Sequence, residues 1–152
     1  MTVYAGWAGL LPFLIFSRER IPVKRIELLD LDPASVKNSL RLNDHWRIQG
    51  RYHARVQDIN QTQPPPQGTI IFNTSCEHLE SSAWWDRIPP GALVVLQGTD
   101  MPHHEHVRLF RDLGEFKSAF SPLRRVWFEG VKEFRYPQLS FSRFLLIAEK
   151  GP

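Results

Sequence analysis

The sequence has little cysteine, no long apolar run and no long cationic run, and each shortage excludes a class of protein. One cysteine among 152 residues excludes an internal disulfide framework and is compatible with a reducing compartment. The apolar stretch from Leu10 to Phe16 is too short to span a membrane, contains Pro12 and follows no basic segment. We therefore expect a cytoplasmic protein with no membrane partner.

The charge of the chain is only mildly positive, at +3. Arginines and aromatic residues alternate in 46–55 and 124–127, which is one way to bind RNA. Arginines on sheet edges more commonly keep those edges soluble, so nucleic acid is the less favoured partner. A length of 152 residues predicts one domain with a substantial core.

The segment from Arg25 to Leu42 carries the clearest pattern. Residues 26–31 are too densely apolar for a strand with one wet face, and they predict a strand buried on both faces. Asp32 suits a helix N-cap and Pro33 the first helical position. Asp30 then lies at the carboxyl end of a parallel strand, the edge where open α/β sheets bind ligands. Its carboxylate can accept hydrogen bonds from two ribose hydroxyls; a solvated loop acid is the alternative.

A glycine turn precedes this unit. We expect a short strand at Val3–Ala5, a turn at Gly6–Gly9 and a helix at Leu10–Ser17, with Pro12 in its first turn. The glycines let a ligand approach the backbone, and the free amides of the helix start favour polar or anionic groups. Together with the next strand, these elements predict a right-handed βαβ unit.

The rest of the chain continues the alternation of strand, polar turn and helix. We expect strands at Tyr52–Gln57, Thr69–Asn73 and Ala92–Gln97, short helices at Ser81–Ile88 and Leu113–Phe120, and a closing antiparallel hairpin of Arg125–Phe134 and Ser140–Lys150. The remainder of 43–67 looks irregular, and the proline-rich segment 60–68 should be an extended connector. Trp84 and Trp85 are expected to pack on the sheet. Polar residues gather after the strands, at Asp58, 73–78 and 98–107.

This order of motifs resembles the class I S-adenosylmethionine-dependent methyltransferases over nearly the whole chain. The resemblance implies a single α/β Rossmann-like domain over residues 1–152, with helices on both faces of a mostly parallel seven-stranded sheet. The implied strand order is 3-2-1-4-5-7-6 with an antiparallel C-terminal strand, which fits the closing hairpin ending in SRFLLIAEKG. It also implies an enzyme that transfers a methyl group to a small-molecule acceptor.

The same resemblance assigns a set of residues to S-adenosylmethionine. The glycine-rich motif, which lies under the methionine part of the cofactor, is matched by Ala5, Gly6, Trp7 and Gly9. The ribose-binding acid is matched by Asp30, with Leu31 beside the adenine, and the residue that reads the adenine amino group is matched by Asp58. The motif after strand four is matched by Asn73 and Thr74.

Two departures from the family pattern affect the expected activity. The acid that usually begins the first motif is absent, since Val3, Tyr4 and Ala5 stand there. The chain also begins almost at the first strand, so the usual N-terminal cover helices are expected to be lacking. Either a second copy or a partner subunit closes the site, or the site is open. A non-catalytic cofactor-binding partner subunit, or another transferase or lyase that uses the same sulfonium, are the alternative functions.

Histidines supply the candidate bases. Methyl transfer mainly requires alignment of acceptor, methyl and sulfur, but a hydroxyl or ammonium acceptor must also lose a proton. The candidate catalytic residues are His78, Glu77 and His104, and the candidate substrate contacts are Asp100, His103 and His106. A metal held by the HHEH run of 103–106 is an alternative, but the spacing is not that of HExxH, and no metal is expected. Cys76 as a nucleophile is the least favoured alternative.

Overall fold

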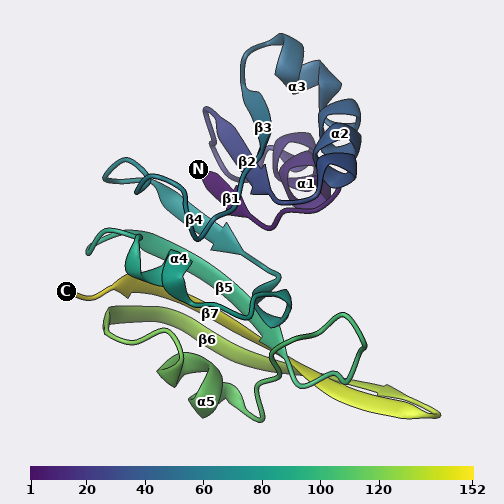
Figure 1. Ribbon diagram of the computed structural model, residues 1–152, viewed down its shortest axis with the longest axis vertical. Coiled ribbons are helices and arrows are strands. Elements are labelled where there is room, and N and C mark those ends of the chain that lie inside the picture. The colour runs from purple at the N-terminus through teal and green to yellow at the C-terminus, as the bar shows by residue number, and fades with distance from the viewer.

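The computed structural model describes residues 1–152, and a single seven-stranded sheet forms its centre (Figure 1). The strands are β1 (Thr2–Tyr4), β2 (Ile26–Asp30), β3 (Tyr52–Val56), β4 (Ile70–Asn73), β5 (Leu93–Thr99), β6 (Leu123–Tyr136) and β7 (Leu139–Lys150). Their order is β3-β2-β1-β4-β5-β7-β6. The first five strands pair in parallel, and β7 is antiparallel to both of its neighbours. The strand order expected from the sequence is confirmed.

The helices are short. They are α1 (Leu10–Arg18), α2 (Pro33–Leu42), α3 (Asp44–Ile48), η1 (Cys76–His78), a 3₁₀ turn, α4 (Ala83–Asp86) and α5 (Leu113–Ser118). Helix α3 lies in a segment that the sequence predicted to be irregular, and that prediction is wrong there. Five residues are too few to show a helical period in the sequence. Trp46 anchors the helix by stacking on Phe16, with ring centroids 5.1 Å apart. Helix α4 covers only the middle of the predicted 81–88. No helix has the length and the apolar character that crossing a bilayer requires.

Two hydrophobic cores lie on the opposite faces of the sheet, since successive strand residues point to opposite sides. Val3 and Leu28 belong to a core of 6 buried residues that includes Ile15 and Phe16 of α1. Tyr4 and Leu29 belong to a core of 17, which also holds Trp84 and Trp85 as predicted, together with four phenylalanines, Phe110, Phe116, Phe120 and Phe144. Figure 1 shows α1, α2 and α3 gathered beside β1–β3, and α4 and α5 beside β4–β7.

The β2–α2 connection follows the predicted capping pattern. The Asp32 carboxylate accepts hydrogen bonds from the backbone N–H groups of Ala34 and Ser35, each at 3.0 Å, and Pro33 begins the helix. The Ser35 hydroxyl also donates to Asp32 and is the largest cause that lowers the pKa of that carboxyl. The cap fixes where the chain turns after β2, and with it the position of Asp30.

The C-terminal hairpin is much longer than the strands beside it and projects from the sheet (Figure 1). Phe134 and Phe141 stack across the two strands, with ring centroids 5.0 Å apart. On the edge strand, the guanidinium of Arg125 lies 3.7 Å from the centroid of the half-exposed Trp127 ring. The edge is thus charged and aromatic, as sheet edges that avoid further pairing often are.

Candidate functional site

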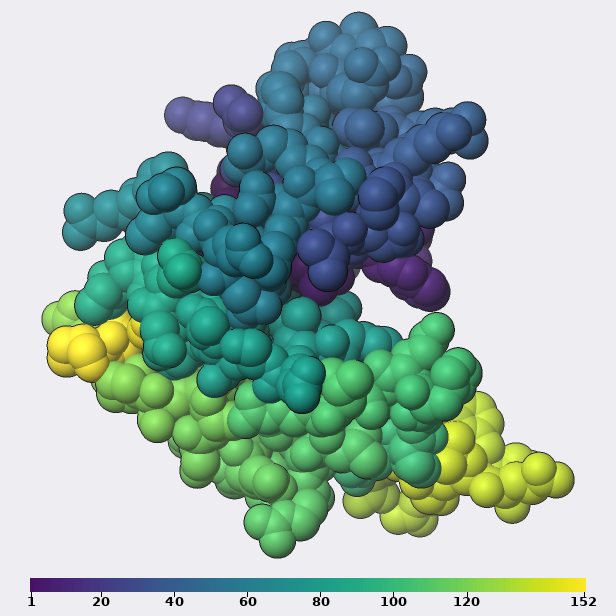
Figure 2. Space-filling model, in the orientation of Figure 1, coloured from purple at the N-terminus to yellow at the C-terminus, as the bar shows by residue number.

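A cavity of about 420 Å³ lies at the carboxyl ends of β1, β2, β3 and β4. Its lining residues are Ala5, Trp7, Asp30, Leu31, Gln57, Asp58, Ile59, Asn60, Ser75, His78, Leu79 and Glu105. In Figure 2 a hollow separates the purple N-terminal segment from the green loop after β5. Six of the residues expected to form a site therefore meet here: Ala5, Trp7, Asp30, Leu31, Asp58 and His78.

The loop after β1 is held in an unusual backbone conformation. Ala5 and Trp7 have φ angles of 47° and 50°, a region that residues with a side chain adopt only when the surroundings enforce it. The Trp7 amide donates to Asp30 Oδ2 at 2.8 Å, and the Ser75 hydroxyl donates to the Ala5 carbonyl at 3.1 Å. The loop is thus fastened to β2 on one side and to the β4 end on the other.

Asp30 is fixed by two backbone amides. Its Oδ1 accepts from the Asp32 N–H at 2.9 Å, and its Oδ2 from the Trp7 N–H. Each carboxylate oxygen can accept about two hydrogen bonds, so acceptor capacity remains on both oxygens. The carboxylate is therefore oriented before any ligand arrives.

Gly6 and Gly9 do not line the cavity. A Cβ on Gly6 would lie 2.5 Å from Leu28 Cδ1, and one on Gly9 would lie 2.7 Å from Ser39 Cβ. The backbone at Gly9 has a φ of 75°, and its carbonyl accepts a hydrogen bond from Asn43 Nδ2 at 3.0 Å. These glycines allow the turn to pack against β2 and α2, and the cofactor contact expected of Gly6 and Gly9 stays a prediction.

The acid near the start of the first motif has no substitute in the structure. Tyr4 stands in that neighbourhood and is buried, and burial raises its pKa to about 12. A neutral phenol, not a carboxylate, therefore lies at this position, and it faces the larger core.

The turn after β3 brings polar and apolar groups to the opposite wall. Asp58 Oδ1 accepts from the Asn60 amide at 2.9 Å, and its Oδ2 accepts from Gln61 Nε2 at 2.9 Å. Ile59 from the same turn and Leu31, whose side chain is 69% exposed, offer apolar surface to the cavity. Gln57, Ile59 and Asn60 were not anticipated; their adjacency to Asp58 was the only available signal.

The end of β4 supplies a buried amide and a histidine. Asn73 is fully buried; its Oδ1 accepts from the Ser75 N–H at 3.1 Å, while its Nδ2 has no partner. Neither Asn73 nor Thr74 lines the cavity, so their cofactor contact stays a prediction. His78 does line it, and its Nδ1 lies 3.1 Å from the Glu105 carbonyl oxygen.

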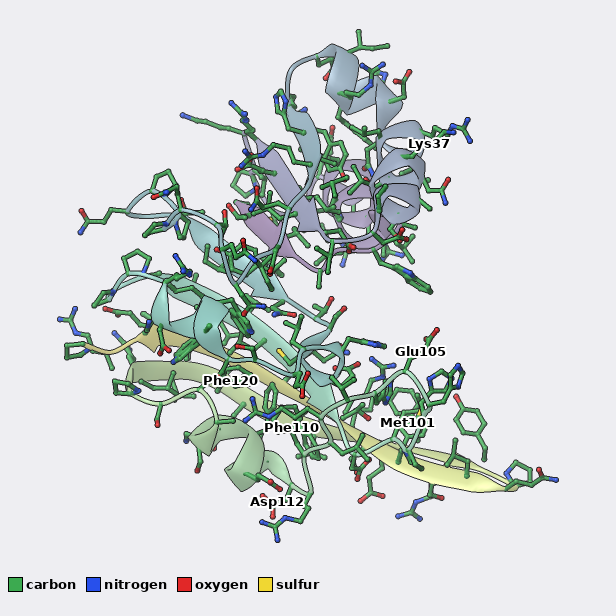
Figure 3. All side chains as sticks on the ribbon, viewed as in Figure 1. Lys37, Met101, Glu105, Phe110, Asp112 and Phe120 are labelled. Atoms are coloured by element: carbon green, nitrogen blue, oxygen red, sulfur yellow. The ribbon has the colours of Figure 1, made fainter.

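The loop after β5 contributes Glu105 alone to the lining (Figure 3). Asp100 instead accepts a hydrogen bond from the backbone N–H of Ser142 on β7. His103 and His104 are exposed, and His106 places its Nδ1 2.7 Å from the Met101 carbonyl oxygen. The substrate contacts expected of Asp100, His103 and His106, and the catalytic role expected of His104, thus remain predictions, and Asp100 already has a structural partner.

Cys76 lies in an environment that suppresses its reactivity. Burial raises the pKa of its thiol well above the usual value, and the neighbouring negative charge of Glu77 raises it further. Because the thiolate is the nucleophile, we expect labelling by Ellman's reagent to be at least about 100-fold slower in the native protein than in guanidinium. Equal rates in the two states would restore Cys76 as a candidate nucleophile.

Comparison with known proteins gives a likeness of structure without one of sequence. No protein-family model and no curated protein matches the chain. Many solved structures do. A geranyl diphosphate C-methyltransferase from Streptomyces coelicolor A3(2), in complex with Mg²⁺, geranyl diphosphate and S-adenosyl-L-homocysteine, superposes with a TM-score of 0.70 at 14% identity, over 98% of this chain and 70% of that one.

Two further structures resemble most of the chain. MccD matches with a TM-score of 0.76 at 8% identity, over 98% of this chain and 89% of that one. YcgJ from Bacillus subtilis matches with a TM-score of 0.69 at 12% identity, over 99% of this chain and 91% of that one. With the strand order, the antiparallel β7 and the cavity at the carboxyl edge, these likenesses establish that the chain has the fold of the class I S-adenosylmethionine-dependent methyltransferases.

Proposed function

We propose that the protein is an S-adenosylmethionine-dependent methyltransferase acting on a small-molecule acceptor. The observation that carries the proposal is the Asp30 carboxylate, oriented by two backbone amides at the wall of a cavity in a fold of this kind. The likeness to a methyltransferase crystallised with S-adenosyl-L-homocysteine and a small diphosphate supports it.

The residues around the cavity fit an adenosine group. Asp30 keeps acceptor capacity for two ribose hydroxyls, as its two amide contacts leave lone pairs on both oxygens. Leu31 and Ile59 offer apolar surface for the faces of the base, and Asp58 and Asn60 offer polar atoms for its edge. The bound cofactor would supply an electrophilic methyl group on a sulfonium. The cavity volume lies within the range of about 300–1,000 Å³ that is usual for ligand sites.

The protein's contribution to the reaction would be alignment and proton removal. His78 lies on the cavity wall, and a proton on its Nδ1 would be donated to the Glu105 carbonyl. This tautomer leaves the lone pair on Nε2, which is the form that can take a proton from a hydroxyl or ammonium acceptor. The neighbouring Glu105 carbonyl thereby fixes both the tautomer and the orientation of the ring.

We expect His78→Gln to lower turnover about 100-fold, the lower end of what a positioned general base contributes. The affinity for S-adenosylmethionine should change by less than about threefold, since His78 would act on the acceptor. The substrate for this test comes from a screen of small phenols, thiols, amines and carboxylates for release of S-adenosylhomocysteine. His53→Gln, on β3 and outside the cavity, is the control. Equal turnover in all three proteins would remove His78 from the mechanism.

The first test of the proposal itself is calorimetric titration with S-adenosylmethionine and, separately, with NAD. We expect binding of S-adenosylmethionine at one site per chain and none of NAD. A folded protein that binds NAD, or neither ligand, would overturn the proposal. Binding without S-adenosylhomocysteine release on any acceptor would favour the non-catalytic partner subunit.

Exposed apolar side chains at the cavity rim support closure of the site by another chain. Trp7 is 74% exposed and Leu31 is 69% exposed, and both line the cavity. Such a cluster is unusual for a surface that stays in water. A second copy of the chain or a partner subunit that covers Trp7 would exclude water from the transferring methyl group. Light scattering of the purified protein with and without S-adenosylmethionine distinguishes these arrangements.

A further inference from the structure

Three metal-ligating side chains converge beside the cavity. Glu77 and His78 come from the turn η1 after β4, and His106 comes from the loop after β5. One ligand atom from each lies within 4.8 Å of the others. The rings of His78 and His106 meet edge to face, with centroids 4.8 Å apart. The cluster is formed by segments almost thirty positions apart in the chain and is closed by backbone hydrogen bonds from Val107 and Arg108 to the Glu77 carbonyl oxygen.

Both histidines are held in the tautomer that suits a metal ligand. Nδ1 of His78 lies 3.1 Å from the Glu105 carbonyl oxygen, and Nδ1 of His106 lies 2.7 Å from the Met101 carbonyl oxygen. A carbonyl can only accept, so Nδ1 carries the proton in each ring, and Nε2 keeps its lone pair. Hydrogen bonding of the second ring nitrogen to a carbonyl is the arrangement that orients histidines in metal sites.

Glu77 is the independent sign that a cation belongs here. Its side chain is 3% exposed, and its buried Oε2 has no hydrogen-bond partner. No lysine or arginine forms an ion pair with it. A buried carboxylate left without a partner costs several kcal/mol, unless it is paired with a cation or neutralised by a proton.

We propose that Glu77, His78 and His106 bind a divalent transition metal ion of the zinc class. Two imidazoles and one carboxylate suit zinc and its neighbours better than the oxygen-seeking magnesium or calcium. Three protein ligands leave a fourth position open, as in catalytic zinc sites. In a tetrahedral zinc site, ligand atoms lie about 3.4 Å apart, given metal–ligand bonds of about 2.1 Å. Because the ligand atoms lie within 4.8 Å of one another, the side chains must rotate to bring them to this spacing around an ion.

The neighbouring exposed cluster is a weaker candidate. His103, His104 and Glu105 also have ligand atoms within 4.8 Å of one another, but all three side chains are exposed. The Nδ1 of His103 already accepts a hydrogen bond from the Glu105 N–H at 3.3 Å. Nothing buried in that cluster lacks a partner, so water satisfies it.

The role of the ion rests on the proposed function, whereas its binding does not. His78 lines the cavity, so an ion on its Nε2 would lie beside the acceptor. His78 cannot ligate a metal and accept a proton through the same nitrogen. With the ion bound, the cation would polarise the acceptor and lower the pKa of its hydroxyl or ammonium group, so the histidine would not be needed as the base.

Zinc binding by the purified, chelator-stripped chain tests the proposal, with a chromophoric chelator as competitor. We expect one equivalent to bind with a dissociation constant below about 1 μM, and Glu77→Gln and His106→Asn each to weaken binding at least about 30-fold. His104→Asn is the matched control from the same loop and should change affinity less than about threefold. Tetrahedral-type visible absorption of the Co²⁺ form should be lost in the same two variants.

Other outcomes would overturn the proposal. The first is the absence of stoichiometric zinc binding by the folded wild type. The second is a loss of zinc affinity in His104→Asn as large as that in Glu77→Gln and His106→Asn, which would place the ion at the exposed cluster. If Glu77→Gln fails to fold, as judged by circular dichroism, His106→Asn decides alone, since its ring is only partly buried. Asp30→Asn separates the two proposals, because it should weaken cofactor binding about 100-fold and leave zinc binding intact.

Discussion

Replacing Asp30 by asparagine is expected to weaken binding of S-adenosylmethionine about 100-fold. An asparagine has one acceptor oxygen, so it can satisfy only one of the two amides that the carboxylate now accepts from, those of Trp7 and Asp32. It also loses the charge-assisted hydrogen bonds to the ribose hydroxyls, worth about 3 kcal/mol together, or about 100-fold in the dissociation constant. Calorimetric titration of the variant measures the effect directly.

The control for this substitution is Asp32→Asn. Asp32 lies two residues further on, caps α2 and does not line the cavity. Asparagine remains a good N-cap residue there, although it loses one of two amide hydrogen bonds, as it does at Asp30. Its affinity for the cofactor should stay within about threefold of wild type. Unchanged affinity in Asp30→Asn would show that Asp30 serves only to hold the Trp7 loop, and the proposed cofactor site would then be wrong.

Gly9→Ala is expected to lower the free energy of unfolding by about 3 kcal/mol. The left-handed backbone at Gly9 costs a residue with a side chain roughly 1–2 kcal/mol, and the overlap of its Cβ with Ser39 and Asn43 adds a similar amount. For a chain of this size, the melting temperature should fall by about 10 °C. Thermal unfolding followed by circular dichroism measures the change.

Gly50→Ala separates the two contributions. Gly50 has a φ of 70°, close to that of Gly9, but a Cβ there would have no atom within 4 Å. We expect it to cost about 1 kcal/mol, the backbone contribution alone. Similar losses in the two variants would mean that the turn does not need its tight contact with α2. Where Gly9→Ala is still folded, its affinity for the cofactor tests the contact expected of Gly9, which does not line the cavity: an affinity close to that of wild type would contradict that expectation.

Local chemistry explains which parts of the structure the sequence could predict. The N-cap of Asp32 and the dense apolar run before it are readable because both depend on neighbours within a few residues, and they place Asp30 at the sheet edge. The strand order came from the resemblance to a family, since local sequence patterns do not reveal which strands are neighbours in the sheet. Helix α3 was missed because a five-residue helix is held by the stacking of Trp46 on Phe16, a tertiary contact.

The site residues that were missed have a common cause. Gln57, Ile59 and Asn60 reach the cavity through the shape of one turn, and Glu105 through the path of a long loop, and neither has a sequence signature. In the same way, the sequence raised a metal only as an alternative, at the adjacent residues of the HHEH run, and no metal was expected. The structure instead brings His106 to Glu77 and His78, and leaves His103 and His104 exposed.

The unequal size of the two hydrophobic cores has a consequence for cooperativity. The face that holds α1 and Tyr52 of β3 is secured by 6 buried residues, whereas the other face has 17. The segments that carry Asp30 and Asp58 contribute to both faces, because Leu29 and Ile59 belong to the larger core and Leu28 to the smaller one. We expect α1 and the smaller core to open at the lower free-energy cost and to loosen these segments on one face. A ligand that bridges these acids to the β4 end binds only the closed form. Occupancy of the site and the folding of the N-terminal half are thus one linked equilibrium.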